Sequence, residues 1–387
     1  MRKILFIFAM TIMALSSCHK DPKGTYIPKD FDKYCESTVE QWHIPAMTAV
    51  VVKNGEVVYL KGFGKTKLDG TGVPVDPETT QFVMASTTKA MTGTLLAGVI
   101  DEYDVDWTDP VKKHLPDFRM YDEWVSDNMM VEEVNAHHHG WNGYALDDLP
   151  MFGYDREDIY KLFAAVKPTY SFRTKYAYNN EMYTVTAKII EKYTGMSWDD
   201  AIQKRLFQPL KMTHSTTGAK AFFSSKDLAY GYEVGYDAQK DSLYTTPCDD
   251  RDDAFTWMTA VAPAAFAMTT GSDMANYLKM HLDHGVFEGD TLISRKNHDY
   301  LFKPQTITGY SDNYLRTYGQ GWIVEQNNKV RYIRHTGLAY GYTALVGLVP
   351  ELGLGFAFMC TNGMTSDPLE AMGKRLIDMY LYQDGPD

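Results

Sequence analysis

The chain has 387 residues, of which 44% are hydrophobic and 23% are charged, as is typical of a globular protein with a large core. Its formal net charge of −12 argues against a nucleic-acid-binding function, which needs a basic surface, and against electrostatic capture by anionic lipids. The length allows two domains or one large two-lobed unit, and no internal repeat is visible.

Residues 1–18 differ from the rest of the chain. Arg2 and Lys3 precede a short apolar run, residues 4–15, and the chain then continues as Leu-Ser-Ser-Cys, residues 15–18. The run is too short to cross a bilayer comfortably and is typical of an export signal. Its ending resembles a bacterial lipobox, which implies cleavage before Cys18 and lipid attachment to that cysteine. An ordinary secretion signal or a chance apolar terminus are the alternatives.

Cleavage at that site would leave residues 19–29 as a polar tether and residues 30–383 as the folded domain. The mature chain would hold 36 basic and 50 acidic residues, a formal charge of −14. We therefore expect an exported bacterial lipoprotein of the cell envelope, on the periplasmic or outer-surface side. Contact with the membrane would be through the N-terminal lipid alone, because no other segment is long and apolar enough to span a bilayer.

The first elements of the predicted domain are a helix and a hairpin. Residues 31–42 have the pattern of an amphipathic helix. Two β-rich runs follow within residues 47–64, joined by Asn54-Gly55, a dipeptide that strongly favours a two-residue hairpin turn.

The middle of the chain is predominantly helical in pattern, with long irregular stretches such as 213–260 between the helices. The clearest predicted helices cover residues 89–103, 157–165, 182–194, 198–206 and 272–284.

The C-terminal part returns to β structure and ends in a helix. Segments 321–337, 341–350 and 354–362 are predicted as three strands, with turns at Asn327-Asn328 and at 351–353, before a final helix at 367–382. Consecutive strands joined by short turns are antiparallel. We therefore predict an α+β, two-lobed fold, in which both chain ends build one antiparallel sheet flanked by helices and the middle forms a mostly helical lobe.

A serine and a lysine stand at the start of the apolar helix FVMASTTKAMTGTLLAGVI, residues 82–100. Ser86 and Lys89 are three residues apart, so a helix places them on one face. A lysine kept out of water tends to lose its proton and can then act as a base toward a neighbouring hydroxyl. Ser-x-x-Lys is a short pattern that also occurs by chance, and a second copy, residues 17–20, lies at the predicted processing site.

Two further motifs follow downstream. Tyr178-Asn179-Asn180 is a Tyr-x-Asn, and His335-Thr336-Gly337 lies at the end of a predicted strand. In isolation, Tyr178 is read more readily as a core aromatic and His335 as a hydrogen-bonded residue at the end of a strand. Their order after Ser86 and Lys89 makes a catalytic constellation the better interpretation, because acyl transfer needs a nucleophile, a proton relay and substrate-holding groups.

This order of motifs resembles the serine β-lactamase and DD-peptidase family, and it looks closest to the class C β-lactamase-like branch. The resemblance covers residues 30–383 and implies a β-lactamase/transpeptidase-like fold. Stretches that also resemble the family are 104–118, 178–198, 318–322, 335–350 and 361–362.

The resemblance implies a role for each matching residue. Ser86 would be the acylated nucleophile, Lys89 its activating base and Tyr178 the group that passes protons to the leaving group. The expected substrate-binding residues are Asn180, His335, Thr336, Gly337 and Leu338. Within that set, Asn180 would hold a substrate amide and Thr336 a substrate carboxylate. The backbone N–H groups of Ser86 and Leu338 would form the oxyanion hole.

Three departures from the family pattern limit what the resemblance implies. His137-His138-His139-Gly140 places a histidine where a small hydroxyl residue is common, and Ala264, Ala265 and Ala267 occupy a segment usually richer in glycine. Histidine also replaces lysine at position 335, which weakens the case for a dedicated β-lactamase and predicts pH-dependent substrate binding near neutrality. A metal site at the three histidines is disfavoured, because consecutive side chains diverge and no acidic partner pattern accompanies them.

The predicted function is therefore a serine acyl hydrolase that cleaves an amide, peptide or β-lactam bond through a Ser86 acyl-enzyme, without metal or cofactor. Peptidoglycan fragments and β-lactams are the expected substrates, and D-aminopeptidase activity is compatible with the same motifs. The alternatives are an esterase of the same family and a non-catalytic, surface-anchored binding module. Cys35, Cys248 and Cys360 form no CxxC pattern, and Cys360 is predicted to be a small core residue.

Overall fold

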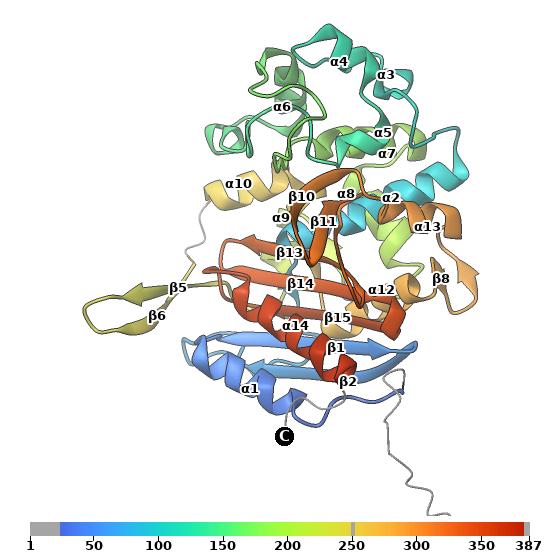
Figure 1. The fold of residues 1–387 in the computed structure, drawn as a ribbon. Helices are drawn as coiled ribbons and strands as arrows, with labels where there is room; N and C mark the ends of the chain where they lie inside the picture. Colours follow the sequence, from blue (N-terminus) through green and yellow to red (C-terminus); the bar gives the residue numbers. More distant parts are fainter. Residues whose placement is uncertain (1–23, 249–251, 383–387) are drawn as a thin grey trace, which may run out of the picture.

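The computed structural model describes residues 24–248 and 252–382, except for the side chains of 252–254. The predicted signal peptide, Cys18 and the first part of the tether lie outside these residues. Figure 1 shows a large sheet in one half of the molecule and a helical lobe in the other, with α2 (Thr88–Glu102) lying between them.

The sheet has eight strands in the order β10-β11-β12-β13-β14-β15-β1-β2, and all neighbours are antiparallel. Strand β1 pairs with β15, so that Met47 lies opposite Cys360. The prediction that both chain ends build one antiparallel sheet is confirmed. The strand bounds are β1 Ala46–Lys53, β2 Glu56–Gly64, β10 Thr306–Ser311, β11 Tyr314–Tyr318, β12 Ile323–Asn327, β13 Arg331–Ala339, β14 Tyr342–Val349 and β15 Leu354–Cys360.

Local chemistry explains the first hairpin. Asn54 and Gly55 have φ angles of 52° and 82°, the left-handed conformations that a two-residue turn between twisted strands requires and that these residue types tolerate. The predicted turn is therefore confirmed.

Helices cover both faces of the central strands, which explains why these strands are apolar on both sides. Along β15, Phe356 and Phe358 pack with α1 (Phe31–Gln41) and α14 (Asp367–Leu381), whereas Ala357 and Met359 face the core shared with α12 (Gly271–Leu282). Successive residues of a strand point to opposite faces, so one apolar run serves two cores. Cys360 is buried in β15, as predicted.

The predicted helices are present with small changes at their ends, and the predicted helix 272–284 is α12, which packs on the sheet. The other helices are α2, already given, and α3 Val111–His114, α4 Glu123–Asn128, α5 Val131–Val134, α6 Arg156–Leu162, α7 Tyr183–Thr194, α8 Trp198–Ile202, α9 Ala219–Ser224, α10 Asp252–Ala260, α11 Ala262–Ala265 and α13 Arg295–Leu301. The segment after α8 continues as a π-helical turn, Gln203–Phe207. Among the described residues, no helix has the length and apolarity needed to span a membrane.

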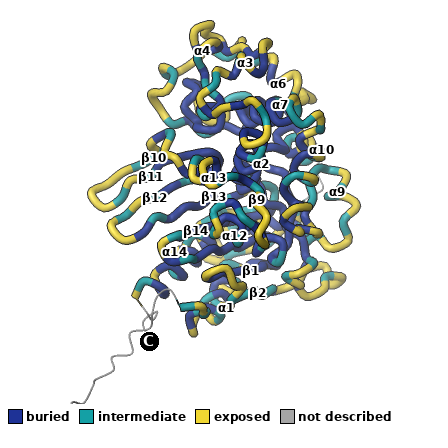
Figure 2. Tube along the Cα trace, turned by 90° about the vertical axis from the view of Figure 1, so that its right-hand side faces the viewer, coloured by how far each residue is buried: buried dark blue, intermediate teal, exposed yellow. Residues whose placement is uncertain are grey.

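The structure differs from the sequence prediction in several places. Segment 321–337 forms two strands, β12 and β13, because the turn at 327–328 reverses the chain. Strands β10 and β11 extend the sheet edge from a region where no strand was predicted, and their partly exposed, Thr-, Ser- and Gly-containing sequences lack an apolar alternation. The stretch 213–260 is less irregular than expected: β5 (Tyr232–Asp237) and β6 (Ser242–Pro247) form a hairpin that projects from the body (Figure 1). Figure 2 shows exposed loops projecting from the sheet edge at β10 and β11.

Candidate active site

Ser86 lies in a short 3₁₀ turn, Ala85–Thr87, that leads directly into α2. The preceding residue, Ala85, has a φ angle of 45°, which is uncommon for a residue with a side chain. The Thr87 hydroxyl donates to the Met84 carbonyl at 2.8 Å, and the Ala267 N–H donates to the Thr88 hydroxyl at 3.0 Å. These contacts hold the serine at the start of the helix in one position, which confirms the predicted placement of Ser86.

Strand β13 passes against this turn at Gly337. A Cβ atom at Gly337 would overlap the Met84 carbonyl oxygen and lie 3.0 Å from the Ser86 backbone nitrogen. A glycine at this position therefore allows the strand to approach the serine. His335, Thr336 and Leu338 are brought to the same end of the site by this contact, and Leu338 is 46% exposed.

The Lys89 side chain is fully buried, and its Nζ contacts three oxygen atoms: Ser86 Oγ at 3.2 Å, Asn180 Oδ1 at 2.6 Å and the Ala264 carbonyl at 3.0 Å. The amide and carbonyl oxygens can only accept hydrogen bonds. A neutral amine would donate its two N–H groups to them and would retain its lone pair for the Ser86 hydroxyl. The geometry thus fits a base that takes a proton from Ser86.

The electrostatic surroundings support the same protonation state. Burial lowers the pKa of Lys89 to about 7, and the carboxyl groups of Asp147 and Glu181 oppose this shift. Burial raises the pKa of Tyr178 well above its usual range, although a hydrogen bond with Ser86 opposes that rise. Near neutral pH the lysine is therefore the better proton acceptor and the tyrosine remains protonated.

Tyr178 and Asn180 reach the site from the segment before α7, as the sequence predicted. The Lys89 Nζ lies 4.7 Å from the centroid of the Tyr178 ring. Asn180 holds Lys89 through its oxygen and donates from its nitrogen to Asp147 Oδ1 at 2.8 Å. Because a carboxylate only accepts, this second bond fixes the orientation of the amide.

His335 differs from the sequence expectation. Its Nδ1 lies 2.6 Å from its neighbour's carbonyl, Thr336 O, and must donate, so its Nε2 accepts from the Tyr318 hydroxyl at 2.8 Å. Burial and the nearby charges of Lys89 and Arg334 lower the pKa of His335 to about 3. The expectation that His335 titrates near neutrality is therefore wrong, because the ring is buried beside cations.

The histidines at 137–139 diverge, as the sequence analysis assumed. His137 Nδ1 accepts from the Asn179 N–H at 3.2 Å, and its ring centroid lies 4.5 Å from that of Tyr178. His138 contacts the Thr306 hydroxyl at 2.9 Å, and His139 Nε2 donates to the Ala177 carbonyl at 2.9 Å. These rings fix the wall of the site and the segment that carries Tyr178.

Two carboxyl groups near Lys89, those of Asp147 and Glu181, were not predicted from the sequence. Asp147 comes from an irregular loop, and its contact with Asn180 has no sequence signal. Glu181 directly follows the Tyr-x-Asn motif and is completely buried, and burial raises its pKa well above the usual range. The signal available for Glu181 in the sequence was its position directly after the Tyr-x-Asn motif.

A cleft of about 280 Å³ adjoins the site, and Leu338 lies in its wall. The lining residues are Asp147, Asp148, Met151, Trp257, Leu338, Ala339 and Tyr340. A larger cavity of about 750 Å³ lies beside α6, α7 and α10, and Ser86 and Lys89 are among the lining residues of neither cavity. The smaller cleft is therefore the better candidate for substrate, because it is linked to Lys89 through Asp147 and Asn180.

Known proteins resemble this chain over most of its length. An "Unguisins hydrolase ungD'" of Aspergillus campestris is 26% identical over 86% of this chain and 61% of its own length. "Protein flp" of Staphylococcus aureus strain COL is 25% identical over 86% of this chain and 62% of its own length. The chain therefore spans about three fifths of the length of these curated relatives.

A solved structure described as the octameric penicillin-binding protein homologue from Pyrococcus abyssi has the same fold. It superposes with a TM-score of 0.74 at 21% identity, covering 92% of this chain and 77% of its own. The model of the family named Beta-lactamase matches residues 31–380. The chain therefore belongs to the Beta-lactamase family, whose members are generally serine hydrolases.

Proposed function

We propose that this protein is a serine acyl hydrolase that cleaves an amide, peptide or β-lactam bond through an acyl-enzyme on Ser86. The observation that carries the proposal is the contact of Lys89 Nζ with Ser86 Oγ, with two carbonyl oxygens occupying the amine N–H groups. A base within hydrogen-bond reach of a hydroxyl, held by other groups, is the arrangement that activates a serine nucleophile.

The reaction would proceed in two halves. Lys89 takes the Ser86 proton while Ser86 Oγ attacks the substrate carbonyl, and Tyr178 passes a proton to the leaving group. The backbone N–H groups of Ser86 and Leu338 stabilise the oxyanion, whereas Asn180 and the 335–337 segment hold the substrate. A water molecule then attacks the acyl-enzyme, which releases the acid and restores the Ser86 hydroxyl.

The first experiment measures the intact mass of the protein after brief exposure to benzylpenicillin and, separately, to a fluorophosphonate probe. We expect a single covalent adduct with at least one reagent, lost in Ser86→Ala. A penicillin adduct that persists indicates slow deacylation, as in a DD-peptidase, whereas consumption of the drug without an adduct indicates a β-lactamase. Unmodified protein with both reagents, together with no hydrolysis of p-nitrophenyl esters, would favour the binding module and refute the proposal.

The charge of the cleft favours one substrate class within this activity. Asp147 and Asp148 line it together with the aromatic rings of Trp257 and Tyr340, and none of the described residues that line it is basic. The imidazole of His335 is neutral, so it brings no positive charge for a substrate carboxylate. Carboxylates and aromatic faces attract a cation, so we propose that acyl donors with a free amine, as in a D-aminopeptidase reaction, are preferred.

This preference can be measured with paired substrates. We expect D-alanyl p-nitroanilide to be cleaved with a higher kcat/KM than its N-acetylated form, and Asp148→Asn to reduce the ratio. Asp148 is exposed at the rim, so the change should leave the fold intact. Equal or better cleavage of the acetylated substrate would refute the amine preference and leave the Ser86 reaction untouched. Rapid cleavage of esters alone would instead identify an esterase.

We further propose that the chain is exported and anchored through a lipid on Cys18. The support is the sequence of residues 1–18, with its basic start, short apolar run and lipobox-like ending. Metabolic labelling with a radioactive fatty acid in a bacterial host should mark the protein, and Cys18→Ser should abolish the label. A labelled Cys18→Ser protein would contradict this site of attachment.

A further inference from the structure

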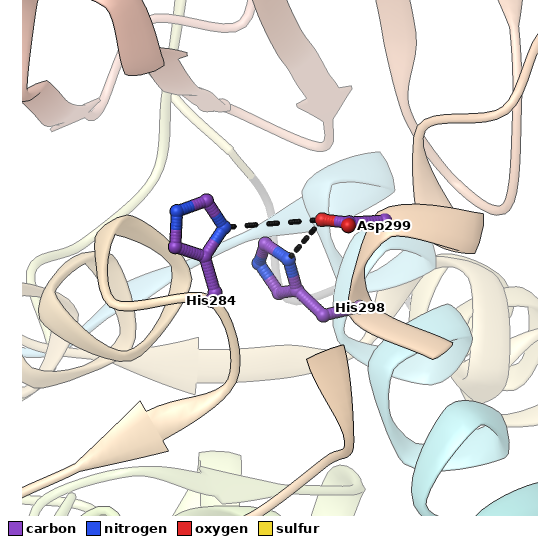
Figure 3. A group of neighbouring side chains, drawn as sticks. All are labelled: His284, His298 and Asp299. Atoms are coloured by element: carbon purple, nitrogen blue, oxygen red, sulfur yellow. Dashed lines mark hydrogen bonds and ion pairs between the residues drawn. The ribbon is translucent and has the colours of Figure 1, made fainter. Parts of the chain in front are cut away.

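A second group of polar side chains lies between the C-terminal end of α12 and the helix α13 (Figure 3). His284 comes just after the C-terminal end of α12, and His298 and Asp299 are neighbours on α13. The Asp299 Oδ1 atom lies 3.8 Å from His284 Nδ1 and 3.5 Å from His298 Nδ1. One ligand atom from each of the three residues falls within 4.8 Å of the others, which is the spacing expected around a metal ion.

Hydrogen bonds behind His298 determine which of its nitrogens carries a proton. The Thr94 hydroxyl donates to the Ala90 carbonyl at 2.9 Å, so its oxygen accepts from His281 Nε2 at 3.4 Å. His281 Nδ1 then has a free lone pair, which accepts from His298 Nε2 at 3.2 Å. The chain of bonds therefore leaves the lone pair of a neutral His298 on Nδ1.

This tautomer directs the His298 Nδ1 lone pair toward the Asp299 carboxylate. The two atoms lie 3.5 Å apart, and either a proton shared between them or a metal ion would satisfy both. The Nδ1 atom of His284 is itself buried and makes no hydrogen bond within the described part of the chain. Three possible ligand atoms therefore converge from two separate segments.

The distances fit a tetrahedral ion. Metal–ligand bonds of about 2.0–2.2 Å separate tetrahedral ligand atoms by roughly 3.3–3.6 Å. The two separations from Asp299 Oδ1, 3.5 and 3.8 Å, need only a small adjustment to reach this range, and the ligand nitrogens of the two histidines lie within 4.8 Å of each other. Imidazole nitrogens with a carboxylate suit zinc and similar transition ions better than calcium or magnesium. A histidine that binds a metal usually donates its other ring N–H to a neighbouring group, as His298 Nε2 does to His281.

We propose that His284, His298 and Asp299 bind one divalent transition-metal ion of the zinc class, with a fourth position open to water. The Asp299 carboxylate also lies 3.8 Å from Arg295 Nε through Oδ2, which leaves Oδ1 for the metal. The ion would join the end of α12, which packs on β1 and β15, to α13, which packs on the nucleophile helix α2. The ion would thus stabilise the packing of these two helices, at a site separate from Ser86 and Lys89.

The test uses the full folded protein after removal of metal with a chelator. Zn²⁺ is titrated by calorimetry at pH 7.5, and Co²⁺ is titrated in parallel by visible absorption. We expect one equivalent of each metal and intense Co²⁺ bands typical of four-coordination. We expect His284→Ala and Asp299→Asn to weaken binding about 10- to 100-fold or more. Both residues are partly exposed, so these variants should fold.

Two controls distinguish metal binding at the proposed site from metal binding at other histidines. His214→Ala removes an exposed histidine elsewhere and should leave the affinity unchanged. Ser86→Ala should also bind metal normally, so the result is independent of the proposed hydrolase activity. Binding weaker than millimolar in the parent, or binding of equal strength in His284→Ala, would overturn the proposal.

Discussion

Lys89 and His335 are two buried basic side chains at the same site, but their surroundings differ. Lys89 lies at the start of α2 and keeps a pKa of about 7, while His335 lies on β13 and has a pKa of about 3. Burial is the largest cause of both shifts. The carboxyls of Asp147 and Glu181 oppose the effect at Lys89, whereas the charges of Lys89 and Arg334 add to it at His335.

The difference shows that burial alone does not decide whether a base can work at neutral pH. A lysine begins from a high pKa, so desolvation brings it toward neutrality, and nearby acids keep it from falling further. A histidine begins near neutrality, so the same desolvation makes it permanently neutral. In this site Lys89 has the pKa of a working base and His335 is suited to neutral hydrogen bonding.

The largest expected effect comes from removing the lysine. Lys89→Ala should reduce the rate of Ser86 acylation about 10³-fold, because the other described groups at the site, Tyr178 and His335, have pKa values unsuited to accept its proton near neutral pH. The rate is measured by intact mass with the reagent that labels the parent, and circular dichroism checks the fold. Lys211→Ala, at an exposed surface lysine, is the control. Acylation at the parent rate would eliminate Lys89 as the base.

A glycine substitution tests the approach of β13 to Ser86. Gly337→Ala should lower the free energy of unfolding by about 1–3 kcal/mol and reduce activity, because its Cβ would overlap the Met84 carbonyl. Gly98→Ala in α2 is the matched control, since its Cβ would meet nothing closer than 3.6 Å. Chemical denaturation measures both variants. Equal stability of the two would show that β13 does not need this close contact.

The pH profile of kcat/KM distinguishes the two bases. Activity should rise with pH through about 7, because the neutral form of Lys89 is the reactive one and its population grows as the pH exceeds its pKa. His335→Asn should lower activity without moving that ionisation, since His335 has a pKa of about 3. Loss of the ionisation near pH 7 in His335→Asn would assign that ionisation to His335 and not to Lys89.

The smallest effect is expected from replacing Asp147, the carboxyl group that influences the pKa of Lys89. Asp147→Asn removes a negative charge that raises the pKa of Lys89, so the rising limb of the pH profile should move to lower pH. The Asn180 amide could still bond to the new side chain, which preserves the geometry. Asp148→Asn is the control, because its effect should be confined to amine-bearing substrates. An unshifted limb would show that Asp147 does not tune Lys89.

Local sequence patterns predicted the elements that carry the site. Ser86 and Lys89 share a helix face because they are three residues apart, and Asn54-Gly55 forms its turn because both residues tolerate positive φ. The strands near both chain ends were recognisable from their apolar runs. Strands β10 and β11 were missed, since their mixed and partly exposed sequences carry no such periodicity.

The sequence by itself predicted Ser86 with Lys89, the Tyr-x-Asn segment and the individual strands near both chain ends, because each depends on residues close together in the chain. Only the tertiary structure decided the protonation of these groups. The Ala264 carbonyl is 175 residues from Lys89, and Asp147 is 33 residues from Asn180. A pKa depends on burial and on charges a few ångströms away, and these are set by packing between distant segments.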